Sequence, residues 1–314
     1  MAQPSDYVVP DQSGRTALIT GANSGLGLQT AIRLAEAGAT VLMACRNPDK
    51  AAAALDTVAR AAPDADVVTV PLDLASLASV REAAEEVRAG RDRLDLLVNN
   101  AGVMAIPRTL TEDGFETQLG TNHLGHFALT GLLIDLVMAT PHSRVVNVSS
   151  TAHKMGRMRF DDLMGERRYE RWSAYGQSKL ANLLFTFELQ RRLTAAGSAT
   201  IAVAAHPGWS ATHLQTSGRG VTGGPMLAAT ELANRVFAQS DAMGALPTIH
   251  AATSPDVIAG GYYGPNGLFE IQGLPTQVVP TVRARDVDAA RRLWARSEEL
   301  TGVRFDVLDT AVAS

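Results

Sequence analysis

The chain has 314 residues, of which 46% are hydrophobic, and its formal net charge is −4 at pH 7. Its length suits one large α/β domain, and so small a net charge argues against nucleic acid or an anionic membrane as a partner. The single cysteine, Cys45, excludes an intrachain disulfide and a cysteine-based zinc site.

Residues 1–14 form a polar N-terminal extension without the apolar core of a secretory signal. No apolar run reaches the ~18–20 residues that a membrane-spanning helix needs, because the longest, 127–139, is short and contains Asp135. We therefore expect a cytoplasmic protein without a membrane span, in which residues 15–314 form a single domain.

Short apolar runs alternate with alanine-rich stretches as far as residue 208. The apolar runs predict strands at 16–20, 40–45, 66–71, 94–100, 144–150 and 200–208. The stretches between them predict helices at 25–38, 48–62, 76–90, 115–139 and 173–196. Because apolar strands that are each followed by a helix form parallel sheets covered on both faces, the predicted fold class is α/β, with one doubly wound Rossmann-type sheet of about seven strands.

The C-terminal third is less regular, with frequent glycine and proline from about residue 213. We expect residues 213–270, together with Met104 and Met155, to form a substrate pocket that is poor in fixed charge. The stretch "GGYYGPNGLFE" (260–270) is predicted to form the last strand and its turn, and residues 286–301 a surface helix.

In open parallel sheets, ligands bind beyond the carboxyl ends of the strands, so each such end is a candidate site. The first strand is followed by "TGANSGLG" (20–27), where glycines permit a tight turn and the next helix presents unpaired N–H groups to a phosphate. The glycine spacing differs from the common G-x-G-x-x-G fingerprint. The residues expected to bind the cofactor there are Gly21, Asn23, Ser24, Gly25, Leu26 and Gly27.

The second strand ends at Cys45-Arg46-Asn47-Pro48. NAD-binding folds usually place an acid here for the ribose 2′-hydroxyl, whereas Arg46 could pair with a 2′-phosphate, which favours NADP(H) over NAD(H). Asn47 is counted with the cofactor-binding residues, although an asparagine before a proline is also typical of a helix N-cap.

The next two strand ends carry weaker signals. Asp73, which precedes Leu74, could accept a hydrogen bond from the adenine amino group, or it could be a turn or capping residue. Both residues are counted with the cofactor site. The motif "NNAG" ends the fourth strand, and the residues expected to line the ribose with backbone atoms are Asn99, Ala101 and Gly102.

The fifth strand ends at Ser149-Ser150, and the helix that follows contains Tyr175 and Lys179, which lie one turn apart on one face. A nearby cation lowers the pKa of a phenol, so the pair could act as a general acid and base while Ser150 holds a substrate oxygen. The alternatives are a chance pair on the helix surface and, for Ser149, a residue that caps the strand.

Together, "TGANSGLG", "NNAG", "NVSS", "YGQSK" and "HPG" resemble the short-chain dehydrogenase/reductase family, in the family's order, over about residues 14–215. The chain is most similar to retinol-dehydrogenase-like and protochlorophyllide-reductase-like members, on the basis of "ACRN", "NHLGHF" and the long gap between Ser150 and Tyr175. The absence of a hydrophobic N-terminal segment favours a bacterial reductase over the membrane-bound retinol enzymes.

The resemblance implies a catalytic tetrad of Asn122, Ser150, Tyr175 and Lys179. Tyr175 would exchange a proton with the substrate oxygen that Ser150 orients, and Lys179 would bind the nicotinamide ribose and lower the Tyr175 pKa. Asn122 would hold a water that links Lys179 to solvent. The residues that would close over the nicotinamide end are Pro207, Gly208 and Thr212.

Two further features of the sequence bear on function. The basic segment 153–172 could be a lid or wall for an apolar substrate, or only a surface loop. No metal site is expected, because no carboxylate or cysteine stands at ligand spacing from the four histidines considered, which are His123, His126, His206 and His213.

The expected activity is NADP(H)-dependent hydride transfer involving an apolar aldehyde, ketone or alcohol. The alternatives are reduction of an activated C=C bond and a non-catalytic NADPH-binding sensor. The resemblance implies dimerisation through the helices at 115–139 and 173–196, so a homodimer or homotetramer is one expectation. A monomer is the other, if segment 153–172 obstructs that surface.

Overall fold

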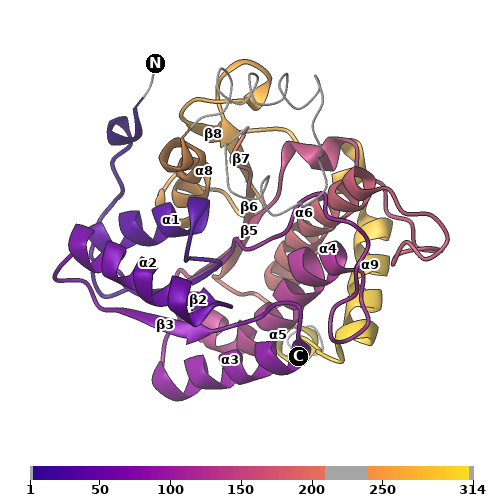
Figure 1. The fold of residues 1–314 in the computed structure, drawn as a ribbon, viewed down its shortest axis with the longest axis horizontal. Coiled ribbons are helices and arrows are strands. Elements are labelled where there is room, and N and C mark those ends of the chain that lie inside the picture. Colours follow the sequence, from indigo (N-terminus) through magenta and orange to yellow (C-terminus); the bar gives the residue numbers. More distant parts are fainter. Residues whose placement is uncertain (1–2, 209–239, 311–314) are drawn as a thin grey trace.

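The computed structural model describes residues 3–208 and 240–310, and within them eight strands form one sheet in the order β3-β2-β1-β4-β5-β6-β7-β8 (Figure 1). Every neighbouring pair is parallel except β7 and β8, which are antiparallel. The predicted doubly wound, mostly parallel sheet is confirmed. The strands are β1 (Thr16–Thr20), β2 (Thr40–Cys45), β3 (Val67–Pro71), β4 (Leu96–Asn99), β5 (Arg144–Val148), β6 (Ile201–Ala205), β7 (Tyr262–Pro265) and β8 (Pro275–Gln277).

The end of the sheet differs from the prediction. The stretch 260–270 supplies β7 and then a 3₁₀ turn, η5 (Leu268–Glu270), but β7 is not the last strand, because the chain returns as β8. The sequence of β8, Pro-Thr-Gln, has no apolar run that would mark a strand. It lies at the sheet edge, where proline is tolerated because one side of the strand needs no ladder hydrogen bonds.

The central strands are buried on both faces because their side chains alternate between two separate cores. Leu18 and Leu97 pack into one cluster, whereas Ile19 and Val98 pack into the other. This arrangement explains the continuous apolar runs in the sequence, since both faces of a parallel sheet are covered.

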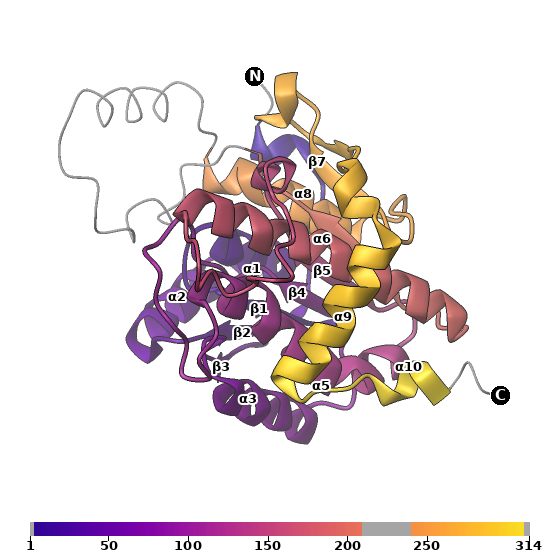
Figure 2. The same ribbon diagram turned by 90° about the vertical axis from the view of Figure 1, so that its right-hand side faces the viewer.

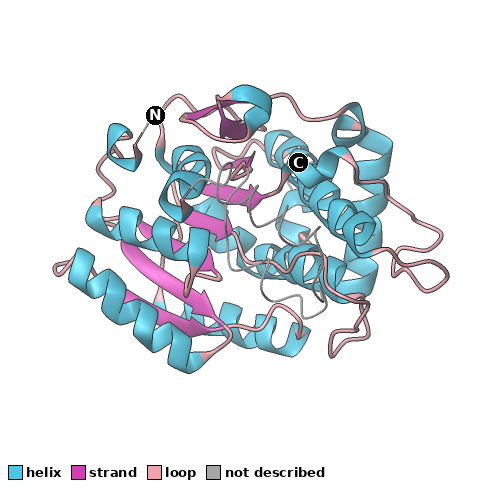
Figure 3. Cartoon of the chain, turned by 45° about the horizontal axis from the view of Figure 1, so that its top comes forward, coloured by secondary structure: helices cyan, strands magenta, loops and turns pink. Residues whose placement is uncertain are grey.

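Among the residues that the structure describes, helices cover both faces of the sheet (Figure 3). On one face lie α1 (Gly25–Glu36), α2 (Pro48–Ala61) and α8 (Asp241–Thr253). On the other lie α3 (Leu77–Gly90), α5 (Gly125–Ala139) and α6 (Arg171–Ala195). Within the described residues, no helix is both long and apolar enough to cross a membrane.

The helix predicted at 115–139 is divided into three parts. A short α4 (Thr117–Leu119) leads through a π-helical turn (Gly120–Leu124) into α5. Gly125 lies against the chain at Leu74, where an added Cβ would come within 2.5 Å of the Leu74 carbonyl oxygen. Such π turns are rare and often occur at functional sites, and this one contains Asn122.

The C-terminal helices α9 (Val287–Thr301) and α10 (Asp306–Thr310) follow a 3₁₀ turn, η6 (Val282–Arg285), and α9 lies across α6 (Figure 2). Trp294 and Phe305 pack edge-on or tilted against Phe127 and Phe185 of the helices beneath. The predicted surface helix is therefore amphipathic, and its apolar side closes one of the two cores.

Candidate active site

The carboxyl ends of β1, β2, β3, β4, β5 and β6 all lie at one edge of the sheet, because these strands are parallel. The predicted site residues therefore share this edge, on the loops that leave it or on the helices that follow. Two parts of the prediction fall outside the described residues, namely Thr212 and positions 213–239 of the expected substrate pocket.

Ser150, Tyr175 and Lys179 are brought together where β5 ends against α6. The Ser150 hydroxyl lies near the Tyr175 hydroxyl and acts to lower its pKa, and Lys179 Nζ lies 5.8 Å from the centroid of the Tyr175 ring. Lys179 Nζ also donates to the Val148 carbonyl oxygen at 3.1 Å. Ser149 instead donates to the backbone oxygen of Lys179 at 2.8 Å, which fits the structural role considered for it.

Burial controls the ionisation of both groups. It raises the pKa of Tyr175 to about 12, and the Ser150 hydroxyl only partly opposes that rise. It lowers the pKa of Lys179 to about 8. In the protein alone, the loss of water around the phenolate outweighs the other influences on the Tyr175 pKa, and the lowering of that pKa by Lys179 stays a prediction.

Asn122 lies beside this cluster in the π-helical turn. Its side chain pairs with both backbone groups of Val103, accepting the N–H at 2.8 Å and donating to the carbonyl at 2.9 Å. It also donates to Ser178 at 2.9 Å. A Cβ added to Gly102 would lie 3.0 Å from Asn122 Oδ1 and 3.5 Å from Lys179 Nζ, so the glycine leaves room between these two side chains.

The loop between β1 and α1 has the shape of a phosphate cradle. Gly21 has a φ of +66°, which favours glycine, and a Cβ on Gly27 would come within 2.3 Å of the Gly21 carbonyl oxygen. Ser24, the N-cap residue of α1, makes no hydrogen bond to the helix with its side chain. The N-terminal N–H groups of α1 are thus not capped by that side chain, which fits the binding of an anionic group such as a pyrophosphate.

The ends of β2 and β3 place Arg46 and Asp73 close together. Arg46 is 72% exposed and its Nη1 lies 3.9 Å from Asp73 Oδ2. Asp73 also accepts the Ala75 N–H at 2.9 Å, so its turn role is present. Asn47 caps α2 by accepting the Lys50 N–H at 2.9 Å, and Leu74 packs into a core.

In the "NNAG" stretch, the two asparagine side chains have roles that differ from the prediction. The Asn99 side chain points into the helical layer and donates to Thr130 and Asn147, at 3.0 and 2.8 Å. Asn100, which the sequence reasoning passed over, donates to the Thr20 carbonyl at 2.8 Å and so joins this strand end to the glycine loop. The second asparagine of the "NNAG" motif was the feature of the sequence from which this role of Asn100 could have been suspected.

Thr20 and His126 were also missed as parts of the site. Thr20 Oγ1 accepts the N–H groups of Asn100 and Ala101, and it bonds His126 Nε2 at 2.8 Å. His126 Nδ1 lies 3.0 Å from the Asn122 carbonyl oxygen and donates to it. His126 therefore has a structural role, and no group of metal-ligating residues occurs among the residues that the structure describes.

Pro207 and Gly208 follow β6 at the same edge. Gly208 has a φ of +70°, and a Cβ there would come within 2.4 Å of the Ile271 carbonyl oxygen. The turn is therefore packed closely against the η5 region.

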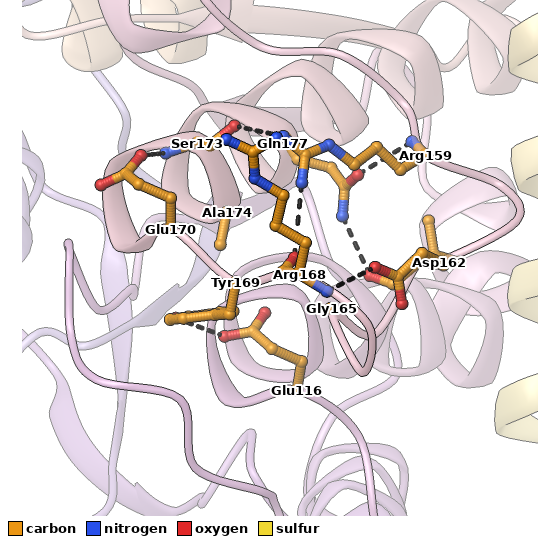
Figure 4. A pocket seen from close by; sticks show the side chains of 11 residues that line it. Glu116, Arg159, Asp162, Gly165, Arg168, Tyr169, Glu170, Ser173, Ala174 and Gln177 are labelled. Atoms are coloured by element: carbon orange, nitrogen blue, oxygen red, sulfur yellow. Dashed lines mark hydrogen bonds between the residues drawn. The ribbon is translucent and has the colours of Figure 1, made fainter.

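Segment 153–172 is attached to α6 at one side (Figure 4). Gln177 accepts the Arg159 N–H at 2.9 Å and donates to the Leu163 carbonyl at 3.0 Å. The Asp162 carboxylate accepts three backbone N–H groups, those of Glu166, Arg167 and Arg168.

At its other side the same segment is attached to the loop that follows β4. The Tyr169 hydroxyl donates to the Ile106 carbonyl at 3.0 Å and also contacts Glu116, while Gln118 donates to it at 2.8 Å. Gln118 in turn accepts the Ala105 N–H at 2.7 Å. The segment thus joins the chain just beyond "NNAG" to the helix that carries Tyr175.

Comparisons with known proteins agree with this geometry. Residues 15–220 match the family described as short chain dehydrogenase. Human retinol dehydrogenase 13 is 42% identical over 96% of this chain and 88% of its own length, and mouse retinol dehydrogenase 14 is 43% identical over 92% and 86%.

Solved structures of related proteins are also similar to this chain. An uncharacterised protein from Mycobacterium paratuberculosis is 45% identical, with a TM-score of 0.79 over 97% of this chain and 98% of its own. The Pseudomonas aeruginosa RhlG/NADP complex is 25% identical, with a TM-score of 0.62 over 80% and 94%. The chain belongs to the short-chain dehydrogenase/reductase family and is an oxidoreductase.

Proposed function

We propose that the chain catalyses NADP(H)-dependent hydride transfer between a nicotinamide and the carbonyl or alcohol group of an apolar substrate, with Tyr175 as general acid and base. The observation that carries this proposal is the buried cluster of Ser150, Tyr175 and Lys179. It lies at the carboxyl ends of the parallel strands, where the glycine loop also lies. Arg46, exposed at the end of β2, supports NADP(H), as does the NADP complex of the RhlG protein.

A bound nicotinamide would supply the hydride in reduction and accept it in oxidation. Tyr175 is protonated at neutral pH, since burial raises its pKa to about 12, and would give its proton to the carbonyl oxygen. Ser150 would hold that oxygen through its hydroxyl. Lys179, a cation below about pH 8, would stabilise the phenolate, and Asn122 would hold a water beside it.

An apolar substrate is supported by the side chains that flank Tyr175. Trp172 is 44% exposed, with its ring centroid 6.4 Å from that of Tyr175, and Met155 is 57% exposed where it meets Gly176. The relatives named retinol dehydrogenase point to a primary alcohol or its aldehyde. No observation on residues 3–208 or 240–310 favours C=C reduction or a sensor, and a cytoplasmic location stays a prediction.

The test is NADPH oxidation with apolar aldehydes, including retinal, and with ketones and enones, using NADH as second cofactor. Tyr175→Phe is expected to lower kcat at least 100-fold, since proton transfer by a positioned side chain contributes ~10²–10⁴-fold, with NADPH affinity within about threefold of wild type. Tyr263→Phe removes another buried phenol hydroxyl, which accepts the Ile258 N–H at 2.9 Å, and should retain activity. Equal turnover by the Tyr175→Phe variant on every active substrate would falsify the proposal.

A further inference from the structure

A second polar cluster lies beside the catalytic cluster, around His206. This histidine directly follows β6 and is 0% exposed. Its Nε2 lies 3.0 Å from Glu270 Oε2, and its Nδ1 accepts the Gly208 N–H at 3.1 Å. Glu270 also pairs with Lys154 Nζ at 3.2 Å. The contacts join the segments that follow β5, β6 and β7.

The hydrogen bonds fix the tautomer of His206. An Nδ1 that accepts the Gly208 N–H carries no proton, so the proton of the neutral ring resides on Nε2. The Nε2 atom lies 3.0 Å from Glu270 Oε2, but the N–H is not aligned with that oxygen, so the two groups meet in a close polar contact and not in a hydrogen bond. The ring is thus fixed on one side by the Gly208 N–H and faces the carboxylate on the other.

The surrounding chain is shaped to this contact. A Cβ on Gly264 of β7 would lie 2.0 Å from His206 Nε2, so only glycine leaves space for the ring. Glu270 has a φ of +59°, and the preceding Phe269 a φ of +54°, in the left-handed region that side chains other than glycine seldom adopt. Such a conformation persists where neighbouring contacts hold it, and the carboxylate of Glu270 makes two of them.

The ionisable groups that face His206 come from each element packed against it. Glu270 approaches from η5, Tyr262 of β7 has its ring centroid 5.2 Å from that of His206, and Lys154 and His153 belong to the 3₁₀ turn after Ser150, Thr151–Lys154. Burial lowers the pKa of His206, and the histidine in turn lowers the pKa of Glu270. At neutral pH the ring is therefore neutral and the carboxylate ionised.

We propose that His206 and Glu270 are a positioning pair that fixes the Pro207–Gly208 turn and thereby sets the affinity for the nicotinamide cofactor. The inference rests on the proposed function, because that function places this turn at the nicotinamide end. Neither side chain is a proton donor in the reaction. They act on the backbone of the Pro207–Gly208 turn, because without His206 the Gly208 N–H would lose its hydrogen-bond acceptor.

The test uses two substitutions that each imitate one ring nitrogen. His206→Asn places an amide oxygen near the position of Nδ1 and retains an acceptor for Gly208, whereas His206→Gln reaches toward Glu270 and loses that acceptor. His250→Gln is the matched control, since the side chain of His250 contacts Tyr7 and Tyr263 and neither Gly208 nor Glu270. Glu270→Ala, at a partly exposed position, replaces any His206 variant that fails to fold.

The readouts are the NADPH dissociation constant, from fluorescence titration, and the hydrogen-exchange rate of the Gly208 amide in the ligand-free protein. His206→Gln is expected to weaken NADPH binding about three- to tenfold, the value of one lost hydrogen bond, and to accelerate Gly208 exchange by a similar factor. His206→Asn should lie between this variant and wild type. The KM for NADPH should change more than kcat.

The outcomes separate the two proposals. Suppose that the folded variants His206→Gln and Glu270→Ala bind NADPH as tightly as wild type and exchange the Gly208 amide at the wild-type rate. Whatever their melting temperatures, this result would overturn the positioning pair and leave the proposed function intact. Failure of the wild-type chain to bind either nicotinamide cofactor would overturn the proposed function. Gly208 exchange in the ligand-free variants would still decide whether His206 holds the turn.

Discussion

Lys179 carries a positive charge at a place from which water is excluded. Burial lowers its pKa from 10.5 to about 8, so at neutral pH the folded protein bears the free-energy cost of a buried cation. Since the folded pKa is the lower one, the unfolded chain binds the proton more tightly. The cost is complete below about pH 8 and disappears as the pH rises toward 10.5.

Lys179→Met is therefore expected to be inactive and yet more stable than wild type at pH 7, by at most about 3 kcal/mol. The Val148 carbonyl keeps a partner, because Asn182 also donates to it at 3.1 Å. Urea denaturation at pH 7 and pH 10 measures the difference, which should shrink at the higher pH. The same substitution at exposed Lys154 should not stabilise the protein, and a Lys179→Met variant less stable than wild type at pH 7 would contradict the argument.

Arg46 is the residue that should choose between the two nicotinamide cofactors. Its guanidinium is mostly exposed and its carboxylate neighbour is 3.9 Å away, so it can turn toward a 2′-phosphate. Arg46→Ala is expected to weaken NADPH binding about 10- to 100-fold, the range for a charge-assisted hydrogen bond, and to leave NADH binding nearly unchanged. Fluorescence titration with both cofactors measures this. Arg60→Ala, at an exposed position near the end of α2, is the control, and an equal loss for both cofactors would count against a phosphate contact.

At the scale of elements, the sequence predicted the helices and strands that are marked by a local pattern of residues. The buried strands appeared as apolar runs, and the start of α2 appeared as Asn47 before Pro48. The π-helical turn at Asn122 and the edge strand β8 could not be read in this way. Just after the turn, Gly125 packs closely against Leu74, and β8 pairs with β7 at the last position of the sheet, and neither contact is visible in the local sequence pattern.

The same limit applies to the candidate site. Residues whose types imply chemistry at a strand end, such as Tyr175 and Lys179, could be proposed from their spacing. Thr20 and its contact with His126 could not, because the partners of Thr20 are 80 to 106 positions away in the chain. The raised pKa of Tyr175 was missed for a related reason, since burial is a property of the folded chain.

Segment 153–172 makes a testable connection between two elements of the site. The Tyr169 hydroxyl joins Ile106, Glu116 and Gln118, so Tyr169→Phe removes three hydrogen bonds between these segments. We expect a loss of stability of roughly 1–3 kcal/mol. If the segment is a wall of the substrate pocket, KM for an apolar substrate should rise about threefold or more with NADPH affinity unchanged. Denaturation and steady-state kinetics measure both. A stability loss with unchanged KM would identify it as a surface loop.

At the scale of the whole molecule, α9 decides which surfaces are open to a partner. It lies across α6 (Figure 2). Its Trp294 contacts both α5 and α6, through Phe127 and Phe185. Part of α5 and α6, the helices expected from the sequence to form an interface between copies, is thus covered by the chain's own C-terminal part. Segment 153–172, which the sequence suggested as the obstruction, also meets α9, since Arg292 stacks on Phe160 at 4.3 Å.

Trp294 and Trp172 form a matched pair for testing this cover. Trp294 is 2% exposed, with ring centroids 4.5 Å from Phe305 and 5.2 Å from Phe127, so Trp294→Ala should cost about 3–5 kcal/mol in unfolding free energy. Trp172 is half exposed at the start of α6, and Trp172→Ala should cost less than about 1 kcal/mol. Because the first variant loosens α9 from an apolar face, light scattering should show self-association that the second lacks. Similar stabilities for the two variants would mean that α9 adds little to the fold, and the face beneath it would then be available to a second copy of the chain.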